Sequence, residues 1–221
     1  MATWVKDSPA SGALAPSHGF PRQLDGATVA IFCDHKFEDM EAMFPKLRLE
    51  EAGAKVLVVG AHEKGTKYLG KFGYPLKSDL HIDDLSEPID ALVIPGGFAP
   101  DYMRRNAAML ATVTKSMERD VPVAAICHGP WMLCSARTAD GKPVASGRRA
   151  TSFSAIKDDL INAGAAFVDK EVVVDGNLIT AQTPNDLVPW VQAIIVATTA
   201  AVKKRLADAK TSPPRAERKS Q

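Results

Sequence analysis

The residues with the clearest chemical potential lie where an apolar run ends in a cysteine. The run 121–126 is followed by Cys127, His128, Gly129 and Pro130, and a proline suits the first turn of a helix. A strand, an abrupt bend and a helix start resemble a nucleophile elbow, where the amides and dipole of the helix favour the thiolate, the reactive form of cysteine. The competing interpretation is a buried cysteine that packs as a small apolar side chain. The histidine and glycine that follow favour the nucleophile.

Backbone and side-chain groups near this cysteine could assist it. His128 can exchange protons near neutral pH, and its amide belongs to the turn where an oxyanion would form, although a solitary histidine is more often structural. Gly97, in a Pro-Gly-Gly turn that ends another apolar run, is a candidate second oxyanion donor because no side chain obstructs its amide. Gly96 and Gly129 are candidate oxyanion or substrate-binding positions. A Gly-Gly turn by itself is weak evidence.

Short strands that alternate with helices must position these groups. Apolar runs predict strands over 28–33, 55–59, 91–94 and 121–126; helical patterns predict helices over 131–136 and 156–163, a loop and helix over 101–118, and a last helix from about 186. Pro45 predicts a kink or break in the helical segment that ends at Gly53. The alternation predicts an α/β fold, a mostly parallel open sheet with helices on both faces, whose reactive groups collect at the carboxyl ends of strands.

Three further segments depart from this alternation. Glycines and aromatic residues between 65 and 80 predict an irregular hairpin, and the Asp-Gly pair at 175–176 predicts a tight hairpin over 172–179. The Pro-, Ser- and Gly-rich residues 1–26 and the basic residues 207–221 are expected to be tails. One domain over 27–206 remains.

Charge and cysteine content narrow the function classes. The 221-residue chain has 27 basic and 26 acidic residues, a balance that favours small molecules or protein side chains as partners over nucleic acid or membrane. Cys33, Cys127 and Cys134 match neither a zinc site nor a disulfide framework, and the other histidines lack ligand spacing, so no metal or other cofactor is expected. Without a leader-like start or a bilayer-spanning apolar run, a cytoplasmic protein in a reducing compartment is expected.

Several motifs together resemble the PfpI-type branch of the DJ-1 superfamily, which is related to class I glutamine amidotransferase domains. The similarity covers nearly everything between the two tails and is strongest over 125–130. The other matching segments are 37–41, 70–74, 95–101, 157–164 and 172–177. The resemblance implies a flavodoxin-like sandwich of the class I glutamine amidotransferase type.

The resemblance also implies roles for two acids. The family places a carboxylic acid against the cysteine sulfur, and Glu38 matches it; beside a thiolate such a carboxyl would have a raised pKa and donate a hydrogen bond. A solvated acid at a helix start is the alternative, and it is the default for Asp39 and Glu41. Asp101 matches an acid that reaches the active-site histidine of a neighbouring subunit, so a homo-oligomer (dimer, trimer or hexamer) would complete the site. A helix N-cap is an equal alternative for Asp101.

The activity implied by the resemblance is that of a cofactor-free cysteine enzyme. Cys127 would convert a 2-oxoaldehyde such as methylglyoxal to lactate without glutathione, in the manner of a glyoxalase III, or deglycate early methylglyoxal adducts on protein side chains. Two alternatives remain open: an intracellular cysteine peptidase or amide hydrolase, and a non-enzymatic redox-sensing stress or chaperone protein. Gln182 stands where relatives often have Arg, which puts a salt bridge or substrate contact in doubt.

Overall fold

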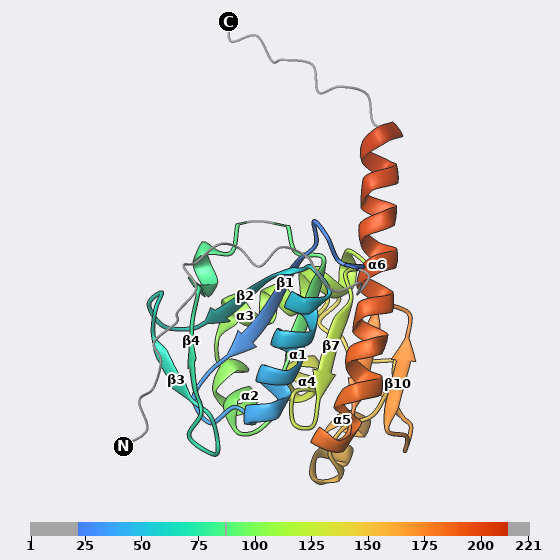
Figure 1. Cartoon of the computed structure of the whole chain (residues 1–221). Helices are drawn as coiled ribbons and strands as arrows, with labels where there is room; N and C mark the ends of the chain where they lie inside the picture. The colour runs from blue at the N-terminus through green and yellow to red at the C-terminus, as the bar shows by residue number, and fades with distance from the viewer. Residues whose placement is uncertain (1–21, 87, 212–221) are drawn as a thin grey trace, which may run out of the picture.

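A computed structural model describes residues 22–86 and 88–211 and is built around a seven-stranded sheet (Figure 1). The strand order is β10-β11-β7-β6-β1-β2-β5, and β10 alone in this sheet runs antiparallel to its neighbour. The strands are β1 (Thr28–Cys33), β2 (Lys55–Gly60), β5 (Leu80–His81), β6 (Ala91–Ile94), β7 (Val123–Ile126), β10 (Val172–Asp175) and β11 (Leu178–Ala181). The predicted α/β fold with a mostly parallel open sheet is confirmed.

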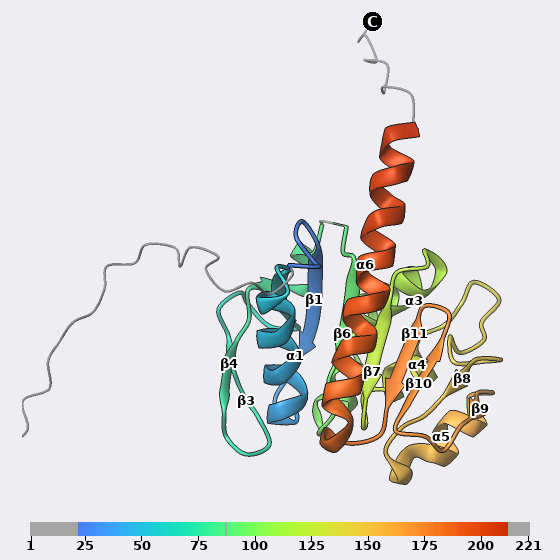
Figure 2. The same ribbon diagram turned by 45° about the vertical axis from the view of Figure 1, so that its right-hand side comes forward.

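Helices cover both faces of the sheet. In Figures 1 and 2, α1 and α6 lie on one face, whereas α3 and α4 lie on the other. The helices are α1 (Asp39–Glu51), α2 (Ala99–Met103), α3 (Ala107–Glu118), α4 (Trp131–Ser135), α5 (Lys157–Asn162) and α6 (Leu187–Thr211), with 3-10 turns η1 (Ile82–Asp84), η2 (Ser154–Ile156) and η3 (Pro184–Asp186). This is the layered arrangement that a parallel sheet requires, because both of its faces must be buried.

Alternating side chains of the central strands feed two separate cores. In β1, Val29 and Ile31 join the core under α1 and α6, while Ala30 and Phe32 join the core under α3 and α4. Successive side chains of a strand point to opposite faces, so a continuous apolar run is what a strand buried on both sides needs. The fully buried Trp190 of α6 anchors the first core. The central strands are therefore rigid supports for whatever follows their carboxyl ends.

Most of the predicted elements are confirmed within a few residues. The bounds of β1 and β6 are those predicted, and the predicted 121–126 strand begins at Val123. The region 101–118 contains two helices instead of a loop and one helix, because the Asn106 side chain caps α3 by accepting the amides of Ala108 and Met109. The hairpin over 172–179 is β10 and β11.

A kink or a break was expected at Pro45, and the break does not occur. Helix α1 is continuous from Asp39 to Glu51 with Pro45 inside it. Pro45 lies on the buried stripe with Glu41 and Leu49, at a spacing of four residues, so its ring packs inside while only one helical amide is lost.

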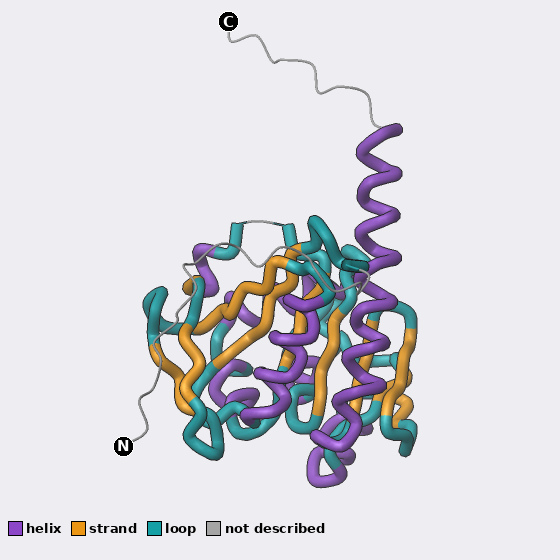
Figure 3. The backbone as a smooth tube through the Cα atoms, in the orientation of Figure 1, coloured by secondary structure: helices purple, strands orange, loops and turns teal. Residues whose placement is uncertain are grey.

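Two small sheets flank the main one. Strands β3 (Lys67–Leu69) and β4 (Pro75–Lys77) form the predicted irregular hairpin. Strands β8 (Arg149–Ala150) and β9 (Ala166–Phe167) pair in parallel, which the sequence did not predict because each has only two residues. Figure 3 shows the loops that gather at the lower edge of the main sheet, where β1 and β7 end.

The predicted domain boundaries need correction at both ends. Residues 22–26 were expected to belong to a tail, yet Leu24 is fully buried in the core with α6, and its amide donates to the carbonyl of Ala52 at 2.8 Å. Helix α6 continues past residue 206 to Thr211. The remaining parts of the two expected tails, 1–21 and 212–221, lie outside the described residues.

Helix α6 extends beyond the body of the domain (Figures 1 and 2). By length and composition, the stretch Pro184–Asp208 could cross a membrane, and 44% of its most apolar window is buried inside the protein. Core helices meet the same criterion, so this is weak evidence for a span.

If Leu24 anchors the domain, Leu24→Ala should lower the free energy of unfolding by about 2–5 kcal/mol, as expected when a buried leucine is truncated. Urea unfolding of the full chain measures this. Gln23→Ala is the matched control because that side chain is exposed. If the Leu24→Ala protein were as stable as the control, residues 22–26 would belong to the tail and not to the domain.

Candidate active site

Cys127 lies on a strained turn at the carboxyl end of β7. Its φ is +59°, a left-handed conformation that non-glycine residues rarely adopt. The turn is fixed on both sides: the Cys127 amide donates to the Ala181 carbonyl and its carbonyl accepts the Phe153 amide, each at 3.0 Å. A Cβ on Gly129 would lie 2.4 Å from the Ile94 carbonyl oxygen, so the bend needs glycine there. The local form is the predicted strand, bend and helix start.

The three candidate glycines have different roles. The backbone amides of Gly97 and His128 both lower the pKa of the Cys127 thiol, which indicates that they face the sulfur. The Gly96 amide instead donates to Glu41 Oε2 at 2.7 Å, and the Gly129 amide to the Ile126 carbonyl at 2.7 Å. Gly96 and Gly129 are therefore not free oxyanion donors in this structure, contrary to expectation, whereas Gly97 and His128 present amides at the sulfur.

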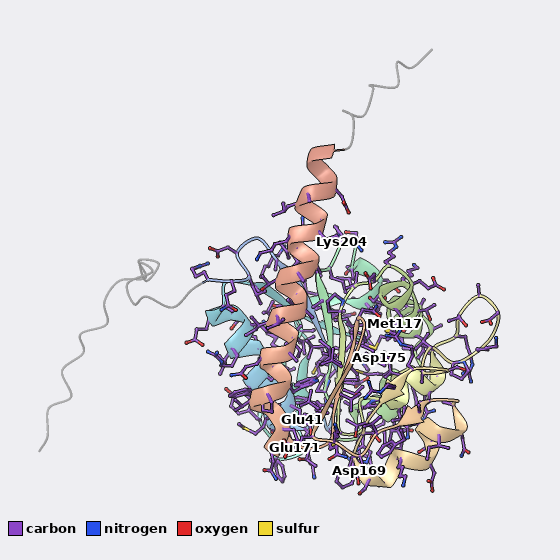
Figure 4. The ribbon with its side chains drawn as sticks, turned by 90° about the vertical axis from the view of Figure 1, so that its right-hand side faces the viewer. Glu41, Met117, Asp169, Glu171, Asp175 and Lys204 are labelled. Carbon is purple, nitrogen blue, oxygen red and sulfur yellow. The ribbon has the colours of Figure 1, made fainter. Side chains whose placement is uncertain are left out.

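The carboxylic acid beside the sulfur is Glu41, which corrects the expectation for Glu38. The side chains of Glu41 and Cys127 interact, and each perturbs the pKa of the other. Glu38 is the N-cap of α1: its Oε2 accepts the Glu41 amide at 2.9 Å. Glu41 is fully buried, not the solvated helix-start acid assumed for it. Figure 4 shows Glu41 toward the lower edge of the molecule, where the strands end.

Helical periodicity holds the signal that sequence reasoning missed. Glu41, Pro45 and Leu49 are spaced by four residues and form one buried row of α1. Glu38 precedes the first helical residue, where a carboxylate most often caps. An acid in line with the buried row was thus the better candidate.

Burial is the main reason why the pKa of Glu41 rises from its usual 4.5 to about 8, and the neighbouring Glu38 charge adds to it. The Gly96 amide, the Cys127 side chain and the Lys71 charge act in the opposite direction. Among the described residues, Oε1 of Glu41 has no hydrogen-bond partner of regular geometry. A neutral carboxyl fits these facts: Oε2 accepts from Gly96, and Oε1 can carry the proton toward the sulfur.

The pKa of the Cys127 thiol is also raised, first by burial and then by the Glu41 carboxylate, while the Gly97 and His128 amides lower it. This differs from the low-pKa thiolate expected from the helix start alone. Two negative charges cannot be held together in so small a volume, so the pair carries one at most. When Glu41 holds the proton, its repulsion on the sulfur disappears and the two amides favour the thiolate.

His128 is held as a neutral imidazole against the sulfur. Its Nδ1 lies 3.2 Å from Cys127 Sγ, and burial and the Lys71 charge lower its pKa. Phe153 stacks on the ring at 5.1 Å between centroids, and Trp131 meets it edge to face at the same distance. Trp131 is itself fixed by a 3.0 Å hydrogen bond to Asp159. These contacts fix the orientation of the imidazole, so it can accept a proton near the sulfur without reorienting.

The other predicted positions lie outside this centre. Asp101 is in the first turn of α2 and pairs with Arg105 of its own chain, so its reach to a neighbouring subunit stays a prediction. Gln182 donates a hydrogen bond to the Asp169 carboxylate at 2.8 Å. Cys33 and Cys134 are buried among core residues. No group of three or more His, Cys, Asp or Glu in the described ranges is arranged to hold a metal.

Comparison with known proteins gives a consistent result. The model of the DJ-1/PfpI family matches residues 27–197. The protein named deglycase PH1704 from Pyrococcus horikoshii is 44% identical over 168 residues, 76% of this chain and 96% of the relative. General stress protein 18 of Bacillus subtilis is 41% identical over 165 residues, 73% and 92% of the two chains.

Solved structures are similar over most of the chain. A two-domain protein from Anabaena variabilis with a DJ-1/ThiJ/PfpI-like domain superposes with a TM-score of 0.72 at 40% identity and covers 76% of this chain and 49% of that one. Drosophila melanogaster DJ-1beta has a TM-score of 0.70 at 25% identity, with 81% and 97% covered.

The raised pKa of Glu41 makes stability depend on pH. Between about pH 5 and 8 the unfolded chain has released this proton and the folded chain retains it, so the free energy of unfolding should fall as the pH rises. Glu41→Gln, which mimics the neutral acid, should make this decrease in the free energy of unfolding smaller by roughly a few kcal/mol. Urea titrations of both proteins across this range measure it. Parallel pH profiles would mean that Glu41 ionises normally.

Gly96 is the position at which added bulk should disturb the centre most. A Cβ there would lie 2.7 Å from Glu41 Oε2 and 2.8 Å from both the Cys127 Cβ and the His128 nitrogen. We expect Gly96→Ala to destabilise the fold by about 1–3 kcal/mol and to change the pH dependence of Cys127 alkylation. Gly141→Ala, where a Cβ meets nothing within 4 Å, is the control for alkylation. An unchanged alkylation profile in Gly96→Ala would contradict the close packing.

Proposed function

This chain belongs to the DJ-1/PfpI family, and we propose that it is a cysteine enzyme that converts 2-oxoaldehydes to 2-hydroxy acids without glutathione and removes early adducts of the same aldehydes. The observation that carries the proposal is the contact of one buried sulfur with a protonatable acid, a neutral imidazole and two backbone amides. Relatives named deglycase or for cysteine protease activity support an enzyme of this family more generally.

The first step is addition of the Cys127 sulfur to the aldehyde carbon of methylglyoxal. A sulfur–carbon bond forms, the carbonyl electron pair moves to oxygen, and the amides of Gly97 and His128 hold the developing oxyanion. Glu41, neutral below about pH 8, then supplies the proton that completes a hemithioacetal. The buried acid thus stabilises the thiolate before addition and protonates the oxygen after it.

Proton transfer between neighbouring carbons follows. The neutral imidazole of His128 takes the proton from the former aldehyde carbon, and the electron pair moves to the ketone oxygen to give an enediolate. The imidazolium returns the proton to the next carbon and the hydroxyl proton passes from the first oxygen to the second, which gives a thioester of the 2-hydroxy acid. Water cleaves the thioester, which releases lactate and restores the thiol. The sequence consumes one water and needs no oxidant, metal or glutathione.

Deglycation would form the same hemithioacetal, starting from an early adduct instead of from free aldehyde. Early adducts release the aldehyde carbon to the thiol, and the amine, guanidine or thiol leaves with a proton. Since removal of free aldehyde also drains these adducts, the two activities need separate assays with isolated adducts and with an aldehyde trap.

Two further parts of the proposal concern assembly and location. Asp101 of one subunit would contact His128 of another in a homo-oligomer, which requires its ion pair with Arg105 to open or rearrange. The proposed location is the cytoplasm. The Asp101→Ala protein, compared with wild type for lactate formation and for mass by light scattering, tests both the contact and the assembly.

A peptidase is the alternative function, and the protease name of one relative supports it. Cys127 is only 8% exposed, which suits a small carbonyl compound better than a peptide. Cleavage of a fluorogenic peptide that is lost in Cys127→Ala would favour the peptidase. Reversible oxidation of Cys127 by peroxide without carbonyl turnover would favour the stress-protein alternative.

The decisive test is lactate formation from methylglyoxal, followed by NMR in buffer without glutathione or amines. Cys127→Ala should abolish it, and Glu41→Gln and His128→Ala should lower kcat about 100-fold or more, the usual contribution of a proton-transfer group. Glu38→Gln is the matched control, because glutamine still caps α1, and it should change kcat by less than about tenfold. Equal lactate from wild type and Cys127→Ala would defeat the glyoxalase assignment.

A further inference from the structure

The hairpin β3–β4 is fixed to the same helix that carries Glu41. Asp39, in the first turn of α1, accepts the Phe72 and Tyr74 amides at 2.9 Å each. A Cβ on Gly70 would lie 2.4 Å from the Asp39 carboxylate, so the turn closes tightly on it. Figures 1 and 2 show the hairpin beside α1. The hairpin turn, residues 70–74, is therefore held against the first turn of α1, close to the buried acid in sequence, and we call this turn the rim of the site.

Lys71 is the basic residue of this turn, and its backbone is connected to the sulfur by direct contacts. The Lys71 amide donates to the Phe37 carbonyl at 2.7 Å, Phe37 forms a β-bridge with Gly97, and the Gly97 amide lowers the pKa of the Cys127 thiol. The Lys71 charge lowers the pKa of both Glu41 and His128. The ammonium therefore acts on the two proton-transfer groups of the centre.

Within the described residues, the ammonium of Lys71 has no carboxylate partner. The ammonium lies over the face of Phe72, 5.1 Å from the ring centroid, and the residue is exposed. The nearby acids are already engaged: Asp39 by two hairpin amides, and Glu38 by the Glu41 amide. A cation at the rim is thus available to an anion that enters from solvent.

We propose that Lys71 determines substrate specificity by favouring carbonyl compounds that carry a carboxylate close to the carbon attacked by Cys127. The role of Lys71 in substrate choice rests on the proposed function. The charge preference at the sulfur, however, can be measured without turnover. Neutral 2-oxoaldehydes remain substrates, since no step at the sulfur needs the ammonium. An anionic analogue gains the attraction of Lys71 in both the encounter and the bound state.

The test compares two alkylating agents that differ in charge. Iodoacetate and iodoacetamide both form a sulfur–carbon bond with Cys127 and release iodide, and the ratio of their second-order rate constants reports the local potential. The full-length protein is alkylated at pH 7 and low salt, and the Cys127 peptide is quantified by mass spectrometry. In Lys71→Gln the ratio of iodoacetate to iodoacetamide should fall about threefold to fivefold, the range for one exposed charge.

Two variants and one condition separate charge from structure. Lys71→Arg should retain the wild-type ratio, and so should Lys67→Gln, which removes an exposed lysine of the same hairpin. Raising the salt from 0.05 to 0.5 M should shrink the difference between wild type and Lys71→Gln, since exposed charges are screened beyond roughly one Debye length. A structural defect would slow both reagents and would not respond to salt in this way.

A second measurement extends the result to substrates. Glyoxylate, an aldehyde with an adjacent carboxylate, should inhibit methylglyoxal turnover, and its inhibition constant should rise at least threefold in Lys71→Gln relative to the KM of methylglyoxal. An unchanged alkylation ratio in Lys71→Gln overturns the role of Lys71 and leaves the proposed function standing. Failure of both reagents to modify Cys127 would overturn both, because each needs an accessible sulfur.

Discussion

The site depends on one constraint: a buried thiol and a buried carboxyl share a volume that can hold a single negative charge. Burial raises the pKa of both Cys127 and Glu41, and the Glu41 carboxylate raises the pKa of the Cys127 thiol further. The fixed dipoles of nearby backbone amides decide whether the sulfur or the carboxyl carries this charge. The amides of Gly97 and His128 face the sulfur and that of Gly96 faces the carboxyl, so the backbone sets which atom carries the charge.

That constraint explains several unusual features of the backbone nearby. Cys127 has a left-handed φ, and Gly97 has one at +72°, which brings its chain against Lys36 and Phe37. Gly96 allows an acid, a thiol and an amide to meet where any side chain would separate them. Parallel strands buried on both faces supply the rigidity that holds these conformations, and two apolar cores clamp the strands from opposite sides.

Sequence alone predicted the fold well because its signals are local and strong. Continuous apolar runs predicted both ends of β1 and of β6 correctly. The bend after β7 identified Cys127 as the candidate nucleophile. The prediction placed the acid three positions too early because Glu38 and Glu41 both lie at the start of one helix. The spacing of four residues that Glu41 shares with Pro45 and Leu49 separates the buried acid from the cap. Leu24 was missed because a single apolar residue in a polar segment has no periodicity. The state of the sulfur could not be predicted either, since it depends on a contact between residues far apart in sequence.

Asp39 has a role that extends past its own hydrogen bonds. Its two carboxylate oxygens join the start of α1 to the hairpin turn, so the same helical turn supports both Glu41 and the rim. Loops that select substrates often diverge independently of the machinery beneath them, but here a hairpin of different length or course would tilt the helix that carries the acid. Within this lineage, changes in substrate range are therefore expected to arise by exchanging side chains on a preserved turn, whereas grafting a foreign loop would disturb reactivity and recognition together.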